Sequence, residues 1–361
     1  MSAGRPVIWL IGPFPPPLHG QAVYNEAFAA QLRQQGELRV LATGEGAISK
    51  LVATARILLI ILFRMRARDM VYTSMPGQMG GWLFASIVAS LRVRGLRHFV
   101  HHHSFRAIVL GPVRVMRLVV ALGGRLQHHI LLSAGMRDRF AALYLGADAA
   151  RAHALSNALL FCPEQAAVPA RPARPATIGH LSVLTRDKGV DVVIALFRRL
   201  AADDPALRLV LAGPVADEGL RAEITRAVAD FPGRVDYRGT VSGAAKRDFF
   251  RDIDLFVLPT RLIDEAEPLV MMESYAAGVE FMGTARGCIP ERLRCADRLL
   301  TGDEDVDAPR VAAVLAEGAR DWTVLREACG RHAEQLHAHA AGEAETLFAD
   351  MLRGRQVAAP R

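Results

Sequence analysis

The sequence is poor in cysteine and in aromatic residues, and its few cysteines are scattered. Its four cysteines form no Cys-x-x-Cys pair and have no histidine at the spacing of metal ligands. A disulfide framework and a structural zinc site are therefore excluded, and the pattern is typical of a reducing compartment. The four are Cys162, Cys288, Cys295 and Cys329.

Long hydrophobic runs are also missing. The run before the first prolines holds about six apolar residues, which is shorter than the apolar core of a secretory signal peptide. The longest apolar run, Leu51 to Phe63, contains Arg56 and is shorter than the roughly twenty residues that cross a bilayer. We therefore expect a cytoplasmic chain that is not integral to a membrane.

The chain is long and has enough apolar side chains for two cores. Its 361 residues are 51% hydrophobic, which excludes intrinsic disorder and makes two domains the expectation. Short β-rich runs alternate with helical patterns, which predicts an α/β protein with parallel sheets covered by helices on both faces. The expected strands are residues 6–12, 38–43, 69–75, 97–103, 128–133, 177–184, 207–213, 234–240, 254–260 and 279–284.

A segment rich in Pro, Ala and Arg separates the two sets of strands and cannot hold regular structure. We therefore predict a Rossmann-like domain at residues 1–165, a linker at 166–177 and a second Rossmann-like domain at 178–335. Residues 336–361 are expected to form a helix that packs back on the first domain. Ligands of doubly wound sheets bind beyond the carboxyl ends of the strands, so we expect the two domains to face a central cleft.

Positive charge is concentrated in the first half, where residues 1–170 hold 18 Lys and Arg against 7 Asp and Glu. These arginines lie beside apolar stretches without regular aromatic residues between them. An anionic membrane surface fits that mixture better than nucleic acid does, although ordinary solvated arginines would give the same pattern. The segment Leu51 to Arg68 fits a helix in the membrane interface and also fits a buried helix of the first domain.

The stretch from Ile263 to Gly278 combines acids, a proline and an apolar run. Pro268 suits the first turn of a helix and Gly278 suits its end, while the amides from Glu267 to Val270 would form an anion site suited to phosphate. Glu273 lies inside this apolar run, where a carboxylate needs hydrogen-bond donors. Sugar hydroxyls would supply them, and so would a neighbouring arginine such as Arg286.

Two further patterns suggest metal sites but fit other interpretations better. Asp252 and Asp254 form an Asp-x-Asp triplet, and both also fit as a helix-end and strand-entry pair. Three histidines, His101 to His103, alternate faces at the end of a predicted strand and cannot all converge on one ion. We therefore expect no metal site, and hydrogen-bonded structural histidines remain an alternative to a functional role.

Four segments in order resemble one family. The stretch "EAEPLVMME" resembles the Glu-x7-Glu signature, with Glu265 and Glu273, of retaining glycosyltransferases of the GT-B fold. "SYAAGV" and "GTARGCIPE" resemble its continuation in glycosyltransferase family 4, in the bacterial polysaccharide-assembly branch. Residues 12–32 and 180–200 resemble the segments that open the two domains. The resemblance covers nearly the whole chain and implies two Rossmann-like doubly wound domains.

The resemblance also implies roles for individual residues. Glu273 would bind the ribose hydroxyls of a nucleotide diphosphate, and Glu265 would contact the donor sugar. Lys188 would neutralise the leaving phosphate, and His103 would face the donor sugar, with His101 as the second match. The implied donor-binding residues are Gly20, His19, Arg186, Glu267, Pro268, Leu269, Val270 and Glu273.

Three positions depart from the family pattern. Val183 stands where the family commonly has an arginine, so that Arg186 would have to supply the second cation. His19 replaces the first of two glycines in the loop before Gly20, and Glu280 replaces a common proline. The first two changes put the strength of donor binding in doubt.

The resemblance implies an enzyme that transfers a hexose with retention of the anomeric configuration, without a cofactor and without a metal.

 The expected reaction moves that sugar from a nucleotide-diphosphate donor to a saccharide acceptor that is carried on a lipid, in the synthesis of surface polysaccharide or exopolysaccharide. The enzyme would work in the cytoplasm, peripherally at the inner face of the cell membrane. A nucleotide-sugar epimerase of the same fold and a non-catalytic sugar-nucleotide-binding subunit remain alternatives.

Overall fold

The computed structural model describes residues 7–15, 20–77, 80–161 and 174–353. His19, Cys162 and most of the predicted linker lie outside the described residues. The chain divides into two compact units, of which the first comprises Met1–Leu160 with His339–Arg361 and the second comprises Phe161–Ala338. Each unit is built on its own sheet.

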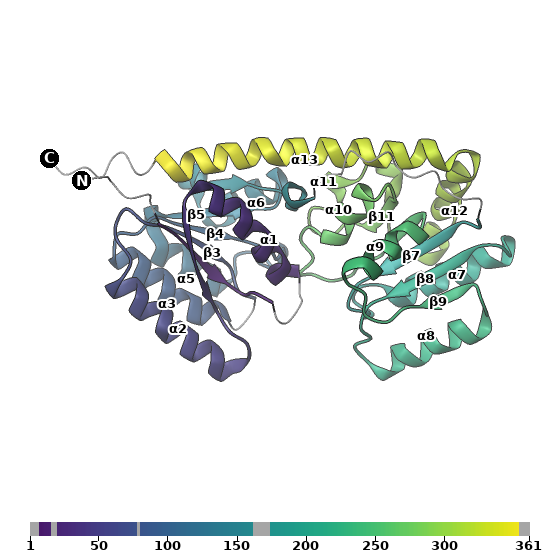
Figure 1. Cartoon of the computed structure of the whole chain (residues 1–361), viewed down its shortest axis with the longest axis horizontal. Coiled ribbons are helices and arrows are strands. Elements are labelled where there is room, and N and C mark those ends of the chain that lie inside the picture. Colours follow the sequence, from purple (N-terminus) through teal and green to yellow (C-terminus); the bar gives the residue numbers. More distant parts are fainter. Residues whose placement is uncertain (1–6, 16–19, 78–79, 162–173, 354–361) are drawn as a thin grey trace. The chain divides into compact units, whose positions relative to one another are not determined.

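The first sheet is parallel throughout and has the strand order β2-β1-β3-β4-β5-β6. Its strands are β1 (Val7–Gly12), β2 (Glu37–Ala42), β3 (Met70–Ser74), β4 (His98–His101), β5 (Gln127–Leu131) and β6 (Ala152–Ala154). Its α-helices are α1 (Gly20–Gln35), α2 (Gly46–Phe63), α3 (Gly80–Val93), α4 (Arg106–Val109), α5 (Arg114–Gly123) and α6 (Ala134–Tyr144). Figure 1 labels β3, β4 and β5 of this sheet and the helices α1, α2, α3, α5 and α6.

The second sheet has the order β12-β11-β10-β7-β8-β9 and is also parallel. Its strands are β7 (Thr177–Leu181), β8 (Arg208–Ala212), β9 (Val235–Tyr237), β10 (Leu255–Leu258), β11 (Glu280–Thr284) and β12 (Leu299–Leu300). Its α-helices are α7 (Val190–Asp203), α8 (Glu218–Asp230), α9 (Gly243–Asp252), α10 (Leu269–Ala276), α11 (Ile289–Arg292) and α12 (Glu304–Arg320).

The ten predicted strands are confirmed, each within a few residues of its expected range. Five of these ten strands are buried along their whole length, as expected for parallel strands with helices on both faces. The sequence missed β6 and β12, the short strands at the edges of the two sheets, because two or three residues show no hydrophobic periodicity.

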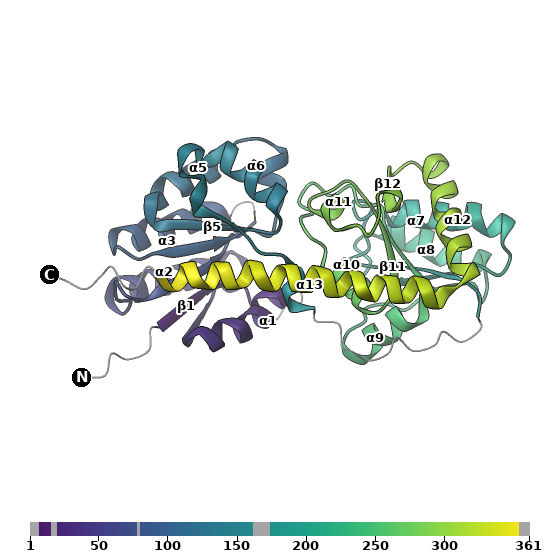
Figure 2. The ribbon, with the colours of Figure 1, turned by 90° about the horizontal axis from the view of Figure 1, so that it is seen from above.

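Helices cover both faces of the first sheet. On one face, Ile57 of α2, Phe84 of α3 and Val119 of α5 share a core with β1 and β3. On the other face, Phe28 of α1 stacks on Phe348, with ring centroids 6.1 Å apart. Phe348 belongs to α13 (Trp322–Arg353), a single long helix whose residues 339–353 are part of the first unit (Figure 2).

Helix α2 is not the buried core helix that the sequence also allowed. Only Ile57 and Ile61 are buried among its 18 residues. The helix begins at Gly46, earlier than the apolar run, and by length and composition it is the one described helix that could cross a membrane, with a mean hydropathy of 2.0. Its apolar composition is therefore not explained by the core of the first unit.

Candidate functional site

The predicted helix start lies at the carboxyl end of β10. Pro268 precedes the first helical residue, Leu269, with φ −62° and ψ 125°, so it caps α10 instead of lying in its first turn. Gly278 follows the helix with φ 71°, a conformation that favours glycine. The first amides of α10 have no acceptor within the helix, and this end of the dipole favours an anion.

Lys188 and Glu265 meet beside this helix start. The Lys188 Nζ donates to Glu265 Oε2 across 2.6 Å, and only 8% of the Glu265 side chain is exposed. Gly189 makes this approach possible because it has φ 81°, and a Cβ there would lie 2.3 Å from the Pro259 carbonyl oxygen. The turn after β7 can therefore lie directly against the end of β10.

A second glycine fixes the backbone at Glu265. Gly287 has φ 55°, and a Cβ on it would lie 2.1 Å from the carbonyl oxygen of Ala266. The next amide, that of Cys288, donates to the same oxygen across 2.7 Å. The segment after β11 therefore holds the Glu265–Ala266 backbone in place, a role that the sequence reasoning did not assign.

Glu273 is paired with a lysine that the sequence reasoning missed. The Lys246 Nζ of α9 donates to Glu273 Oε1 across 2.6 Å, so its cationic partner is this lysine and not Arg286, which the sequence had offered as the alternative to sugar hydroxyls. The other oxygen, Oε2, is buried and has no hydrogen-bond partner among the described residues. A buried acceptor without a donor is unfavourable, and a ligand hydroxyl would satisfy it. In the sequence, the amphipathic pattern of α9 is the feature that could have indicated a functional side chain at Lys246.

The side chain of Glu267 is occupied within the unit. Its Oε1 accepts a hydrogen bond from Arg292 Nε across 2.5 Å, and both side chains are buried. This ion pair anchors the segment before α10 to α11. The carboxylate of Glu267 is therefore engaged by Arg292 within the unit.

Arg186 is directed toward acids of its own unit. Its NH2 lies 2.5 Å from Glu223 Oε1, and its NH1 lies 3.9 Å from Asp191 Oδ2. The hydrogen bond with Glu223 raises the pKa of the exposed Arg186 guanidinium. Val183, at the position of the family arginine, is exposed. Arg186 would have to leave Glu223 to reach a phosphate.

The histidines at the end of β4 and directly after it alternate faces as predicted. The ring centroids of His101 and His103 are 4.2 Å apart, and His101 Nδ1 lies 2.6 Å from the hydroxyl of Tyr72. His102 lies on the other face, with its Nε2 3.0 Å from His129 Nδ1. Burial lowers the pKa of His103 to about 3, so this imidazole is neutral near pH 7. Its Nε2 is buried and has no hydrogen-bond partner among the described residues.

The Asp-x-Asp pair is bonded to arginines. Asp254 is buried and accepts hydrogen bonds from Arg174 NH2 at 3.1 Å and from the Thr177 amide at 3.0 Å. Asp252 ends α9 and lies 2.9 Å from Arg238 NH2. These contacts agree with a helix-end and strand-entry pair that holds β7, β9 and β10 together.

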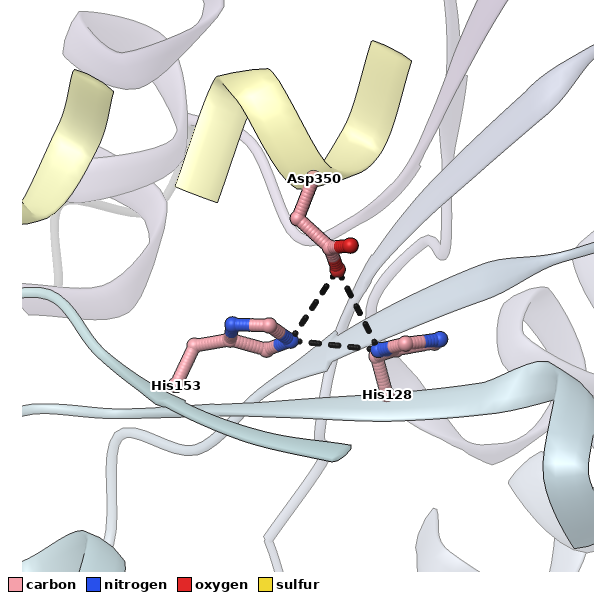
Figure 3. A group of neighbouring side chains, drawn as sticks. All are labelled: His128, His153 and Asp350. Carbon is pink, nitrogen blue, oxygen red and sulfur yellow. Dashed lines mark hydrogen bonds and ion pairs between the residues drawn. The ribbon is translucent and has the colours of Figure 1, made fainter. Parts of the chain in front are cut away.

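One group among the described residues has the spacing of metal ligands, and it is shown in Figure 3. His128 Nδ1 lies 3.1 Å from His153 Nε2, and Asp350 Oδ2 lies 3.6 and 3.4 Å from these two atoms. Arg97 already donates to His128 Nε2 at 3.0 Å and to Asp350 Oδ2 at 2.7 Å. An accepting Nε2 places the proton of His128 on Nδ1, which then points at His153. The group therefore acts as a hydrogen-bonded clasp between α13 and the sheet.

A cavity of about 710 Å³ lies within the first unit, at the carboxyl ends of β1 and β2. Apolar residues such as Phe14, Leu83 and Phe84 form much of its lining, and Glu45 and Lys50 add charge. Such a mixture suits a ligand with an apolar part and a few polar groups. Gly20 opens α1 near this end of the sheet, and the following Gln21 also lines the cavity.

Comparisons with known proteins agree with this architecture. Residues 175–316 match the family model described as glycosyl transferases group 1. Among curated proteins, the chain is 26% identical over 232 residues to the phosphatidylinositol N-acetylglucosaminyltransferase gpi3 subunit of Schizosaccharomyces pombe. That match covers 63% of this chain and 49% of the relative, so the chain spans about half the length of the curated relative it matches.

Solved structures show the fold more completely. The chain is similar to Anabaena Alr3699/HepE in complex with UDP-glucose, with a TM-score of 0.68 at 15% identity over 94% of this chain and 99% of that one. It is also similar to a sucrose-phosphate synthase from Thermosynechococcus elongatus, with a TM-score of 0.70 at 16% identity over 97% and 100% of the two chains. The chain therefore has the GT-B fold, and its second unit contains the region that matches glycosyl transferases group 1.

Proposed function

We propose that this chain is a retaining glycosyltransferase that moves a hexose from a nucleotide-diphosphate donor to a saccharide acceptor. The observation that carries the proposal is the Lys188–Glu265 pair beside the amide end of α10, with the unpartnered Oε2 of Glu273 on the same helix. The lysine and the helix amides suit a diphosphate, and the unpartnered carboxylate oxygen suits the hydroxyls of a ribose.

The proposed mechanism uses these groups in sequence. The ribose hydroxyls donate to Glu273, while the amides at the start of α10 and Lys188 bind the diphosphate. As the bond from the anomeric carbon to the diphosphate breaks, Lys188 stabilises the charge on the leaving phosphate. The acceptor hydroxyl attacks the anomeric carbon from the same face and passes its proton to an oxygen of the leaving phosphate, so that the anomeric configuration is retained. Glu265 contacts the donor sugar and positions Lys188.

We propose that this reaction needs no metal. Asp252 and Asp254, the pair that would hold one, are bonded to Arg238 and Arg174. Positive charge at the diphosphate would come instead from Lys188 and the helix amides.

We further propose that the acceptor is a lipid-linked saccharide of surface-polysaccharide or exopolysaccharide synthesis, and that the enzyme works peripherally at the inner face of the cell membrane. The cavity of the first unit supports this class of acceptor because apolar walls with two charged groups, Glu45 and Lys50, suit an amphiphile. The curated relative is named as a transferase to phosphatidylinositol, which is also an amphiphile.

A non-catalytic sugar-nucleotide-binding subunit is the second candidate, because Arg186 is engaged by Glu223 and the usual second cation is replaced by Val183. A thermal-shift screen of nucleotide sugars would identify the donor, and nucleotide release in the presence of acceptor would then be measured. Release that requires the acceptor supports the transferase. A donor that raises the melting temperature without any release would favour the binding subunit.

A further inference from the structure

The outward face of α2 is apolar. Residues at intervals of three and four share one face of a helix. The face of α2 that contains Ile57 and Ile61 packs against the core of the first unit, which includes Val71. In a helix that faces water, the opposite side carries polar residues. Here the opposite side carries Arg56 and seven apolar residues that are all exposed: Ile48, Leu51, Val52, Ala55, Leu59, Leu62 and Phe63.

The exposure on this outward face is large. Relative exposure reaches 79% at Ile48, 58% at Leu59 and 78% at Phe63. Single exposed apolar residues are common in soluble proteins, but a continuous apolar strip along a five-turn helix is typical of an interaction surface. The neighbouring helix α3 adds Trp82, which is 56% exposed, and tryptophan favours the boundary between lipid and water.

The charged residues of α2 and of the segment that follows it have one sign of charge. Between Gly46 and Arg68 the sequence contains five cations and no Asp or Glu. All five are exposed, and no carboxylate in the described part of the chain forms an ion pair with them. The five are Lys50, Arg56, Arg64, Arg66 and Arg68. A partner for this surface must therefore accept apolar side chains and supply negative charge.

The place of α2 in the fold limits how it can meet a membrane. The helix connects β2 to β3, and its buried residues belong to the core of the first unit. Crossing a bilayer would remove Ile57 and Ile61 from that core, whereas lying in the interface leaves them in place. A second copy of the chain is a poorer partner, because a symmetric interface would bring the same cations together.

We propose that the outward face of α2 docks the first unit on an anionic lipid bilayer, with the helix parallel to the surface. Ile48, Leu59 and Phe63 insert among the acyl chains near the headgroups, and the arginines at the C-terminal end contact lipid phosphates. This docking does not depend on the proposed transfer reaction, so a failure of one would be distinguishable from a failure of the other.

Sedimentation of the full chain with lipid vesicles tests the proposal without any donor. Vesicles of phosphatidylglycerol and phosphatidylcholine should bind the chain, and phosphatidylcholine alone should bind it much more weakly. Each arginine is expected to contribute about fivefold to binding. The triple variant Arg64→Gln, Arg66→Gln, Arg68→Gln should therefore lose about 100-fold in affinity for anionic vesicles, and added salt should weaken the wild type.

The matched charge control replaces three exposed arginines of the second unit, Arg198, Arg199 and Arg226, with glutamine and should bind like the wild type. For insertion, Phe63→Trp in a Trp82→Phe background should be quenched by brominated lipid, whereas Val324→Trp in the same background, at an exposed position of α13, should not be. Equal binding of the wild type to neutral and anionic vesicles would overturn the proposal. Self-association of the chain in lipid-free solution would also overturn it if Leu59→Gln abolished that association, because a second copy of the chain would then cover this face.

Discussion

Lys188 and Glu265 are 77 residues apart in the chain, and their side chains meet across 2.6 Å. Lys188 follows β7 and Glu265 follows β10, which are neighbours in the second sheet. Because the carboxyl ends of adjacent parallel strands meet at one edge, the pair lies where ligands of this kind of sheet bind. The pair also gives each residue a second role, since each fixes the position of the other.

Glu265→Gln should lower the rate of transfer by about 100-fold or more, because a charged contact at the reacting centre is lost. The substitution preserves size, and a glutamine can still contact Lys188, so the fold should be retained. Initial rates with the identified donor would measure the effect. Glu218→Gln, at an exposed position of α8, is the control and should transfer like the wild type. Unchanged turnover in Glu265→Gln would remove this residue from the mechanism.

Lys246→Met should raise the KM for the donor more than it lowers kcat. The substitution leaves Glu273 without its cationic partner, so the carboxylate that is proposed to bind ribose is no longer held in position. The effect should be about tenfold or more, as is usual for a lost charged hydrogen bond. Arg247→Met changes an exposed neighbour on the same helix and should leave both constants near their wild-type values. A loss confined to kcat would contradict the assigned role.

Transfer should persist in excess EDTA, because Lys188 and the amides of α10 are proposed to supply the positive charge at the diphosphate. The measurement is the initial rate before and after the chelator is added. Complete loss of transfer that Mg²⁺ or Mn²⁺ restores would make Asp252 and Asp254 candidate ligands after all.

The sequence predicts the strands well because the central parallel strands are short apolar runs that are buried on both faces. The Glu-x7-Glu spacing also places Glu265 and Glu273 correctly around the start of α10. It does not predict their partners, since Lys188–Glu265, Lys246–Glu273 and Arg292–Glu267 depend on how distant segments pack. Local periodicity contains no information about such pairs.

The surface of α2 was ambiguous in the sequence for a similar reason. Its apolar residues lie on every side of the helix, so their pattern alone does not show which side is covered. The structure resolves this because Ile57 and Ile61 pack inward and Leu59 and Phe63 do not. Burial is a property of the whole unit, and it can be determined only when the neighbouring helices have been placed.

The structure shows the role of Glu280, which could not be predicted from the sequence. Its side chain is buried, and its Oε2 accepts hydrogen bonds from Arg294 Nε at 2.8 Å and from Arg298 Nε at 3.1 Å. Glu280→Ala should destabilise the second unit by about 3 kcal/mol, because Arg298 is left buried without this carboxylate. Urea unfolding would measure the change. Asp297→Ala removes an exposed partner of the same Arg298 and should cost less than about 1 kcal/mol. Equal effects of the two substitutions would refute the role of burial.

Acid should destabilise the first unit before the second. Burial lowers the pKa of His98 to about 4 and that of His102 and His103 to about 3. Since these values lie below the ordinary value of about 6.5, the unfolded chain takes up protons first as the pH falls. Stability is therefore full above about pH 7 and declines as the pH drops from there toward 4. Each such histidine adds up to about 1.4 kcal/mol per pH unit to the dependence of the free energy of unfolding on pH.

Tryptophan fluorescence separates the two units in this experiment. Trp9 and Trp82 belong to the first unit and Trp322 to the second, so a Trp322→Phe variant reports on the first unit alone. Its urea midpoint should fall steeply between pH 7 and pH 5. In a Trp9→Phe, Trp82→Phe variant, Trp322 reports on the second unit, where His180 is the buried histidine whose pKa is lowered to about 4, and the fall should be smaller. His98→Asn should make the stability of the first unit less dependent on pH, because one buried histidine no longer contributes. A first-unit midpoint that is constant from pH 7 to pH 5 would show that these imidazoles are already accessible to protons in the folded chain.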